Sequence, residues 1–155
     1  MNKILVPIDN FSSLSLSAAY FAVEFAKRNP TKVLFLFFSS FRERDEADPG
    51  NKIKPLPKPF DELMQKARAE KINLDLFFSS EGYLDTLPRF ARDHHISEII
   101  LAVPATDDPL YLSVKQQIDE LRSRIDSQMV IVRPKEEKPL TTSGKLEGKD
   151  PLPST

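Results

Sequence analysis

Five short apolar runs alternate with segments that carry apolar residues at helical spacing, and this alternation is what most limits the folds open to the chain. The runs lie at residues 4–8, 32–38, 72–78, 99–103 and 129–132. Four of them are nearly continuous, as expected of strands buried on both faces, whereas Asn73 and Asp75 interrupt the third as in an edge strand. Alternating strands and helices build a parallel sheet through right-handed crossovers. We therefore predict an α/β fold, a doubly wound five-stranded parallel sheet with helices on both faces.

Capping residues and prolines predict where the helical segments begin. Ser12 or Ser13 can cap the first segment, and Pro59 suits the first position of the second. The third segment contains Pro88, which has no N–H to donate. If Asp85 is the N-cap, Pro88 falls in the first turn, where that N–H has no acceptor in any case. We therefore expect the third helix to start at Thr86 rather than earlier.

The chain has 155 residues, 13 prolines and no cysteine. This length suits one domain, which we place at residues 1–134, and the proline-containing, weakly apolar residues 135–155 are expected to form a disordered tail. The missing cysteines exclude a disulfide scaffold, a thiolate zinc site, an iron–sulfur cluster and a cysteine nucleophile.

The charge pattern argues against nucleic-acid and membrane partners. The formal net charge is -1, with both signs mixed along the chain. Such a chain has no basic field for nucleic acid or anionic lipid, and its apolar runs are far shorter than the roughly 20 residues that span a bilayer. The N-terminal run is also too short for a signal peptide. We expect a cytoplasmic protein without direct membrane insertion.

Three stretches resemble one known family in the order in which they occur. They are KILVPIDN with SLSLSAAYFAVEFAKR, then SSEGYLDTLPRFARDHHISEIILAV, then MVIVRP. Together they span roughly residues 2–134 and resemble the universal stress protein (UspA-like) domains. The resemblance implies the strand order 3-2-1-4-5 of the adenine nucleotide alpha hydrolase-like folds.

The chain departs from the family members that bind ATP. Those members carry a Gly-rich stretch after the fourth strand, followed by a Ser or Thr, that surrounds the ribose and phosphates. Here the stretch reads VPATDDP, and no glycine occurs between Gly82 and Gly144. Prolines remove backbone donors, and Asp107 and Asp108 would repel phosphate. We expect a degenerate member with no cofactor, in which ATP or AMP binding is disfavoured.

Any ligand is expected beyond the carboxyl ends of the first and fourth strands, where the strand order reverses. The candidate ligand-binding residues there are Asp9, Asn10, Phe11, Ser39, Val103, Thr106, Asp107 and Ser113. By resemblance, Asp9 would bind a base or ribose. Alternatively, Asp9 only satisfies the turn and the following helix, which is the more common role of Asp there. The crevice is either polar and open or filled by Phe11, Pro104 and Tyr111.

No catalytic or metal site is expected. Asp107 and Asp108 with Asp9 could hold Mg²⁺, but a solvated turn explains them better. The adjacent His94 and His95 suit the end of the third helix more than a metal ion. No serine lies in a G-x-S-x-G motif, so we expect no enzyme. The proline-spaced residues 54–59 are either a polyproline II ligand or, more simply, a stiff loop.

We interpret the chain as a regulatory or interaction module with an unknown protein partner. By resemblance it is a homodimer through the fifth strand, with Met129, Val130, Ile131 and Val132 at the interface, and that apolar edge needs a cover. A second hypothesis is an adenine-nucleotide sensor with a degenerate cleft, in which Thr106 or Ser113 replaces the phosphate loop. A third is a soluble accessory domain of a transporter or kinase system.

Overall fold

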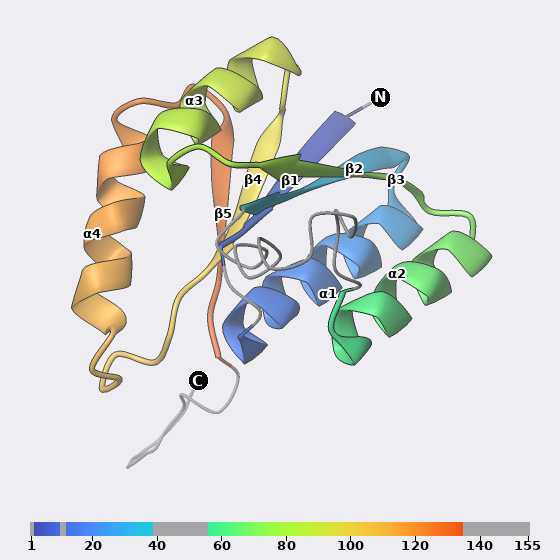
Figure 1. Cartoon of the computed structure of the whole chain (residues 1–155), viewed down its shortest axis with the longest axis horizontal. Coiled ribbons are helices and arrows are strands. Elements are labelled where there is room, and N and C mark those ends of the chain that lie inside the picture. Colours follow the sequence, from blue (N-terminus) through green and yellow to red (C-terminus); the bar gives the residue numbers. More distant parts are fainter. Residues whose placement is uncertain (1, 10–11, 39–55, 135–155) are drawn as a thin grey trace, which may run out of the picture.

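The computed structural model describes residues 2–9, 12–38 and 56–134 and confirms the doubly wound sheet (Figure 1). All strand pairs are parallel, and the order is β3-β2-β1-β4-β5. The elements are β1 (Asn2–Ile8), α1 (Ser13–Arg28), β2 (Thr31–Phe38), α2 (Lys58–Ala69), β3 (Asn73–Ser79), α3 (Tyr83–Asp93), β4 (Glu98–Ala102), α4 (Tyr111–Arg122) and β5 (Gln128–Val132). The residues expected to form the tail lie outside the described part of the chain.

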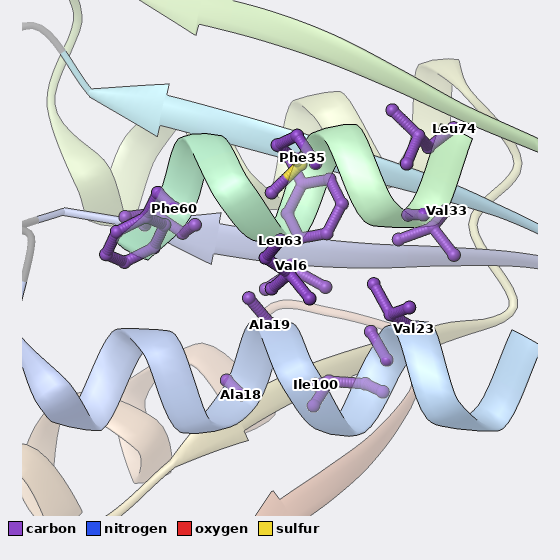
Figure 2. Packing of buried hydrophobic residues seen from close by; sticks show 14 of the residues in the cluster. Val6, Ala18, Ala19, Val23, Val33, Phe35, Phe60, Leu63, Leu74 and Ile100 are labelled. Carbon is purple, nitrogen blue, oxygen red and sulfur yellow. The ribbon is translucent and has the colours of Figure 1, made fainter. Parts of the chain in front are cut away.

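The sheet separates the buried side chains into two clusters. Successive residues of β1 point to opposite faces, so Ile4 and Val6 pack against α1 and α2 while Leu5 packs toward α3 and α4. Figure 2 shows the first cluster, in which Phe35 of β2 lies between the strands and Leu63 of α2. Because the central strands bury both faces, their nearly continuous apolar runs follow directly from this position.

A serine cap marks the start of α1, and a proline lies in the first turn of α2. The side chain of Ser12 accepts a hydrogen bond from the N–H of Ser15 at 3.2 Å, which confirms Ser12 as the N-cap. Helix α2 starts at Lys58, so Pro59 occupies its second position instead of its first. The missing N–H of Pro59 costs nothing there, since the first turn has no intrahelical acceptors.

The predicted start of α3 is wrong. The helix begins at Tyr83 rather than at Thr86, with Gly82 as its N-cap, and Pro88 lies inside it. Proline at this position leaves the carbonyl of Leu84, four residues earlier, without its intrahelical donor. The guanidinium of Arg124 donates to that carbonyl at 3.3 Å. A residue that follows α4 thus supplies the hydrogen bond that Pro88 removes.

This compensation makes a testable prediction for Arg124. We expect Arg124→Ala to lower the free energy of unfolding by about 0.5–1.5 kcal/mol, the net value of a hydrogen bond. In a Pro88→Ala background the helix regains its own donor, so the same substitution should cost much less. Urea unfolding of the four proteins of this double-mutant cycle measures the coupling. Equal costs in both backgrounds would contradict the compensation.

Just after each of the helices α2 and α3, one non-glycine residue has its backbone in the left-handed region. These residues are Lys71 with φ 64° and His95 with φ 56°. In each case the following N–H returns to the last turn, from Ile72 to the carbonyl of Ala67 and from Ile96 to that of Ala91, both at 2.9 Å. These hydrogen bonds satisfy carbonyls that a helix end leaves open and turn the chain sharply into the next strand.

Candidate functional site

A small crevice lies where the strand order reverses, at the carboxyl ends of β1 and β4. It encloses about 90 Å³. Its lining combines apolar side chains with a few polar ones: Pro7, Asp9, Ser12, Leu14, Ser15, Ala18, Tyr83, Leu101, Ala102, Val114, Gln117 and Ile118. Pockets that enclose drug-sized ligands usually have roughly 300–1,000 Å³. The crevice therefore has the expected place in the fold but is far smaller than such a pocket.

Asp9 and Tyr83 are the ionisable groups of this crevice. Asp9 directly follows β1 and is half-buried, and burial raises the pKa of its carboxyl above the ordinary 3.8 although its own backbone N–H partly offsets this. The pKa of Tyr83 is raised strongly, first by burial and then by the negative charge of Asp9. Both groups thus favour their uncharged forms more than they would in water.

Tyr83 is the crevice residue that the sequence analysis missed. It is the first residue of α3, and its ring packs against that of Phe38 with centroids 5.1 Å apart and planes at 51°. The prediction that α3 starts at Thr86 placed Tyr83 in a turn. An aromatic residue directly after a glycine turn at a strand end was the available signal.

The loop between β4 and α4 uses many of its backbone donors within the chain. The carboxylate of Asp108 accepts from the N–H of Leu110 at 2.8 Å, and its carbonyl accepts from the N–H of Tyr111 at 3.0 Å. The N–H of Asp108 itself donates to the carbonyl of Ala105 at 2.9 Å, and that of Val103 donates to the carbonyl of Val132 at 3.0 Å. The carboxylate of Asp108 therefore closes a turn on the N–H of Leu110, the residue that precedes the first residue of α4, and places a negative charge near the start of that helix.

The structure brings few of the predicted ligand-binding residues to the crevice. Among the described candidates, Asp9 lines it, Val103 is buried, and Thr106, Asp107 and Ser113 are exposed outside its lining. Asn10, Phe11 and Ser39 lie outside the described residues. Of the residues expected to fill the crevice, Pro104 and Tyr111 do not line it and Phe11 is not described. Tyr83 occupies this place instead.

The histidines and acidic residues do not assemble into a metal site. Within residues 2–9, 12–38 and 56–134, no group of three His, Asp or Glu side chains could hold an ion. The ring of His94 instead stacks on Phe90, with centroids 4.0 Å apart. The carbonyl of His94 also accepts a hydrogen bond from the ammonium group of Lys3 at 3.1 Å.

The raised pKa of Asp9 predicts how stability should depend on pH. Because the pKa is higher in the folded state, burying the charged carboxylate costs stability above the folded-state pKa, and protonation relieves this cost at lower pH. We therefore expect Asp9→Asn to raise the free energy of unfolding at pH 7. This advantage should shrink as pH falls below the folded-state pKa. Urea unfolding of both proteins between pH 3 and 8 tests this, and an advantage independent of pH would contradict it.

Strand β5 forms one edge of the sheet, with β4 as its partner among the described strands. The N–H of Gln128 donates to the carbonyl of Ser97, and the carbonyl of Val132 accepts from Val103, so these two residues face β4. The alternation of a parallel ladder then directs the N–H and C=O groups of Met129 and Ile131 to the outer edge. Both side chains are half-buried.

Comparison with known proteins identifies the family. The model of the Universal stress protein family matches residues 1–108, and the chain belongs to this family. None of the curated proteins compared with the chain matches it. In the part of the chain that the structure describes, no helix is long and apolar enough to cross a membrane.

Solved structures of the family share the fold at low sequence identity. The chain is similar to the universal stress protein UspA from Lactobacillus plantarum, with TM-score 0.56, 19% identity, and coverage of 85% of this chain and 97% of that one. It is also similar to a universal stress protein from Archaeoglobus fulgidus in complex with dAMP, with TM-score 0.57, 12% identity, and coverage of 85% and 98%. A family protein from Arabidopsis thaliana with AMP bound has TM-score 0.56 and 11% identity, with coverage of 90% and 97%. At these identities the likeness establishes the fold alone.

Proposed function

We propose that this chain is a regulatory or interaction module of the universal stress protein family. In this proposal it acts as a homodimer, has no catalytic activity and does not bind ATP through the Gly-rich motif of the family. The observation that carries the proposal is the hydrogen bond from the N–H of Leu110 to the carboxylate of Asp108.

That hydrogen bond supports the loss of phosphate binding for an electrostatic reason. A phosphate that approached the N–H of Leu110, directly before α4, would have to displace the carboxylate of Asp108, which already accepts from that donor at 2.8 Å. It would also meet the negative charge of Asp107 next to it. The two prolines of the loop, Pro104 and Pro109, contribute no N–H in exchange. Both the charge and the donors of this loop therefore disfavour a polyphosphate.

The size of the crevice supports the same conclusion for the nucleoside. The crevice holds roughly 90 Å³, against the roughly 300–1,000 Å³ of pockets that enclose drug-sized ligands, and the half-buried ring of Tyr83 forms part of its wall. That ring is held against Phe38, so its movement would break an aromatic contact as well as expose apolar surface. Entry of a nucleoside would require rearrangement of α3.

The dimer that we propose pairs β5 with β5 of a second copy, through Met129, Val130, Ile131 and Val132. An edge strand with outward N–H and C=O groups and half-buried apolar side chains favours pairing with another strand. An isologous contact around a two-fold axis would satisfy these groups symmetrically. The module itself would comprise residues 1–134, and we place it in the cytoplasm.

A second candidate function, an adenine-nucleotide sensor, has specific support from the comparisons. Family structures similar to this one contain cAMP, dAMP or AMP. The crevice of this chain also retains Asp9 together with Ser12, Ser15 and Gln117 as polar groups. A monophosphate carries less charge than ATP and would meet less repulsion from Asp107 and Asp108.

Thermal unfolding with AMP, dAMP and cAMP separates the two functions. A ligand present at 100 times its dissociation constant stabilises the folded state by about 2.7 kcal/mol. For a protein of this size that raises the melting temperature by several degrees. We expect no shift at about 1 mM ligand and no nucleotide absorbance in the purified protein. A shift that disappears in Asp9→Ala would establish the sensor instead.

A further inference from the structure

A second hollow, larger than the crevice, lies between the outer strand β3 and helix α3. It measures about 340 Å³, which falls within the usual size range of ligand pockets. Its floor includes Leu36 of β2, and its walls combine aromatic rings with charged residues. It shares no lining residue with the crevice beside Asp9.

Three rings form a rigid wall of this hollow. Phe90 and His94 of α3 stack with centroids 4.0 Å apart and planes at 22°. Phe77 of β3 meets both rings edge-on, at 5.2 Å each. Edge-to-face and offset arrangements are the favourable geometries for such rings, so this wall is preorganised to receive a bulky apolar side chain.

The hollow adjoins the second half of β3, at one edge of the described sheet. Among the described strands, β3 pairs with β2 alone, so its other edge has no strand partner in this part of the chain. Its first half carries Asp75, which forms an ion pair with Lys32 at 2.9 Å. Its second half, residues 76–79, contains neither charge nor proline, the usual means by which edges are guarded. Phe78 is 38% exposed, stacks on Phe37 of β2 with ring centroids 5.2 Å apart, and is among the residues that line the hollow.

The charges at the hollow favour a cationic neighbour. Arg89 is already paired with Glu81, so these two charges cancel. Among the described residues, the cation given for the carboxylate of Asp93 is the guanidinium of Arg92, whose Nε lies 3.8 Å away, and both side chains are largely exposed. The hollow therefore presents one carboxylate beside an apolar, aromatic wall.

We propose that the outer edge of β3 binds an extended peptide as a sixth strand. One large apolar side chain of the peptide would enter the hollow against Phe77 and Phe90. A lysine or arginine two residues away, on the same face of the strand, would approach Asp93. Such a site between a free strand edge and a helix combines main-chain affinity with a specificity pocket. The proposal rests on the interaction role proposed above and identifies the chemistry of the partner.

The test uses the full chain, labelled with ¹⁵N, and a defined peptide. The probe is a hexapeptide with an acetylated N-terminus and an amidated C-terminus. Its side chains alternate between the two faces of a strand, so that a phenylalanine and a lysine lie on one face and two valines on the other. The central valine stands between the phenylalanine and the lysine. We expect saturable chemical-shift changes confined to β3 and α3, with a dissociation constant below about 1 mM. The same peptide with its central valine replaced by proline should not bind, because proline cannot continue the ladder.

Two matched pairs of variants make the result specific. Phe78→Lys should weaken binding at least about tenfold, whereas Phe21→Lys, at a residue 41% exposed on α1, should leave it unchanged. Asp93→Lys should weaken this peptide but not a version that has glutamate in place of lysine. Absence of saturation at about 5 mM, unchanged affinity of Phe78→Lys, or equal binding of the proline peptide would each overturn the proposal. None of these readouts depends on nucleotide or on β5, so this proposal can fail independently of the proposed function.

Discussion

Ile131→Pro is expected to convert the dimer that we propose into a monomer that keeps its fold. The N–H of Ile131 faces the outer edge of β5, so proline there removes no hydrogen bond to β4, yet it blocks the ladder to a second copy. Proline cannot donate to a ladder and is excluded from the interior of a sheet, so the variant should not pair with a second copy at the concentration measured. Light scattering at tens of micromolar should give twice the 17.6 kDa chain mass for the wild type and one chain mass for the variant.

The neighbouring position supplies the control. Alternate residues of β5 direct their backbone groups toward β4, and Gln128 and Val132 are two of these. Val130 is the residue midway between them, so its N–H also faces β4. Val130→Pro should therefore lower the free energy of unfolding further than Ile131→Pro, which loses the packing of a half-buried side chain but no hydrogen bond to β4. A monomeric wild type would overturn the dimer, and an Ile131→Pro variant that remains dimeric would move the interface to another surface.

Phe35→Ala is expected to have the largest effect on stability. Phe35 is fully buried in β2, at the centre of the cluster between the sheet and helices α1 and α2 (Figure 2). Truncation of a buried phenylalanine costs about 3–5 kcal/mol through lost transfer energy and the cavity left behind. That is a large share of the roughly 5–15 kcal/mol that stabilises a typical domain.

Urea unfolding at one protein concentration measures this loss. The midpoint should fall for Phe35→Ala while the slope with denaturant stays constant. Phe21→Ala is the matched control, because Phe21 is 41% exposed on α1 and its truncation should cost less than about 1 kcal/mol. Similar losses for both variants would mean that the cluster around Phe35 is not closely packed.

Periodicity predicted the sheet and its helices because burial acts on every residue of an element. The nearly continuous apolar run at residues 32–38 predicted a strand buried on both faces, and the alternation around Asn73 and Asp75 correctly indicated an edge strand. The strand order, in contrast, came from the family resemblance. Patterns that many residues share are robust, since no single exception changes them.

Features that depend on one distant partner could not be predicted in this way. The start of α3 was misplaced because Arg124, far along the chain, supplies the donor that Pro88 lacks. The same error hid Tyr83 as a crevice residue. The turn that Asp108 closes on the N–H of Leu110 was more accessible, because Asp commonly accepts from an N–H two residues on, and a solvated turn was the favoured interpretation of this segment.

Calorimetric titration of ATP with Mg²⁺ into the purified full chain tests most directly whether the phosphate site is closed by Asp108 and the two prolines. We expect only heats of dilution up to about 1 mM nucleotide, from a protein that carries no nucleotide after purification. Binding with a dissociation constant of about 10 µM or tighter, equivalent to roughly -7 kcal/mol, would contradict it and make this chain a nucleotide-binding member of its family.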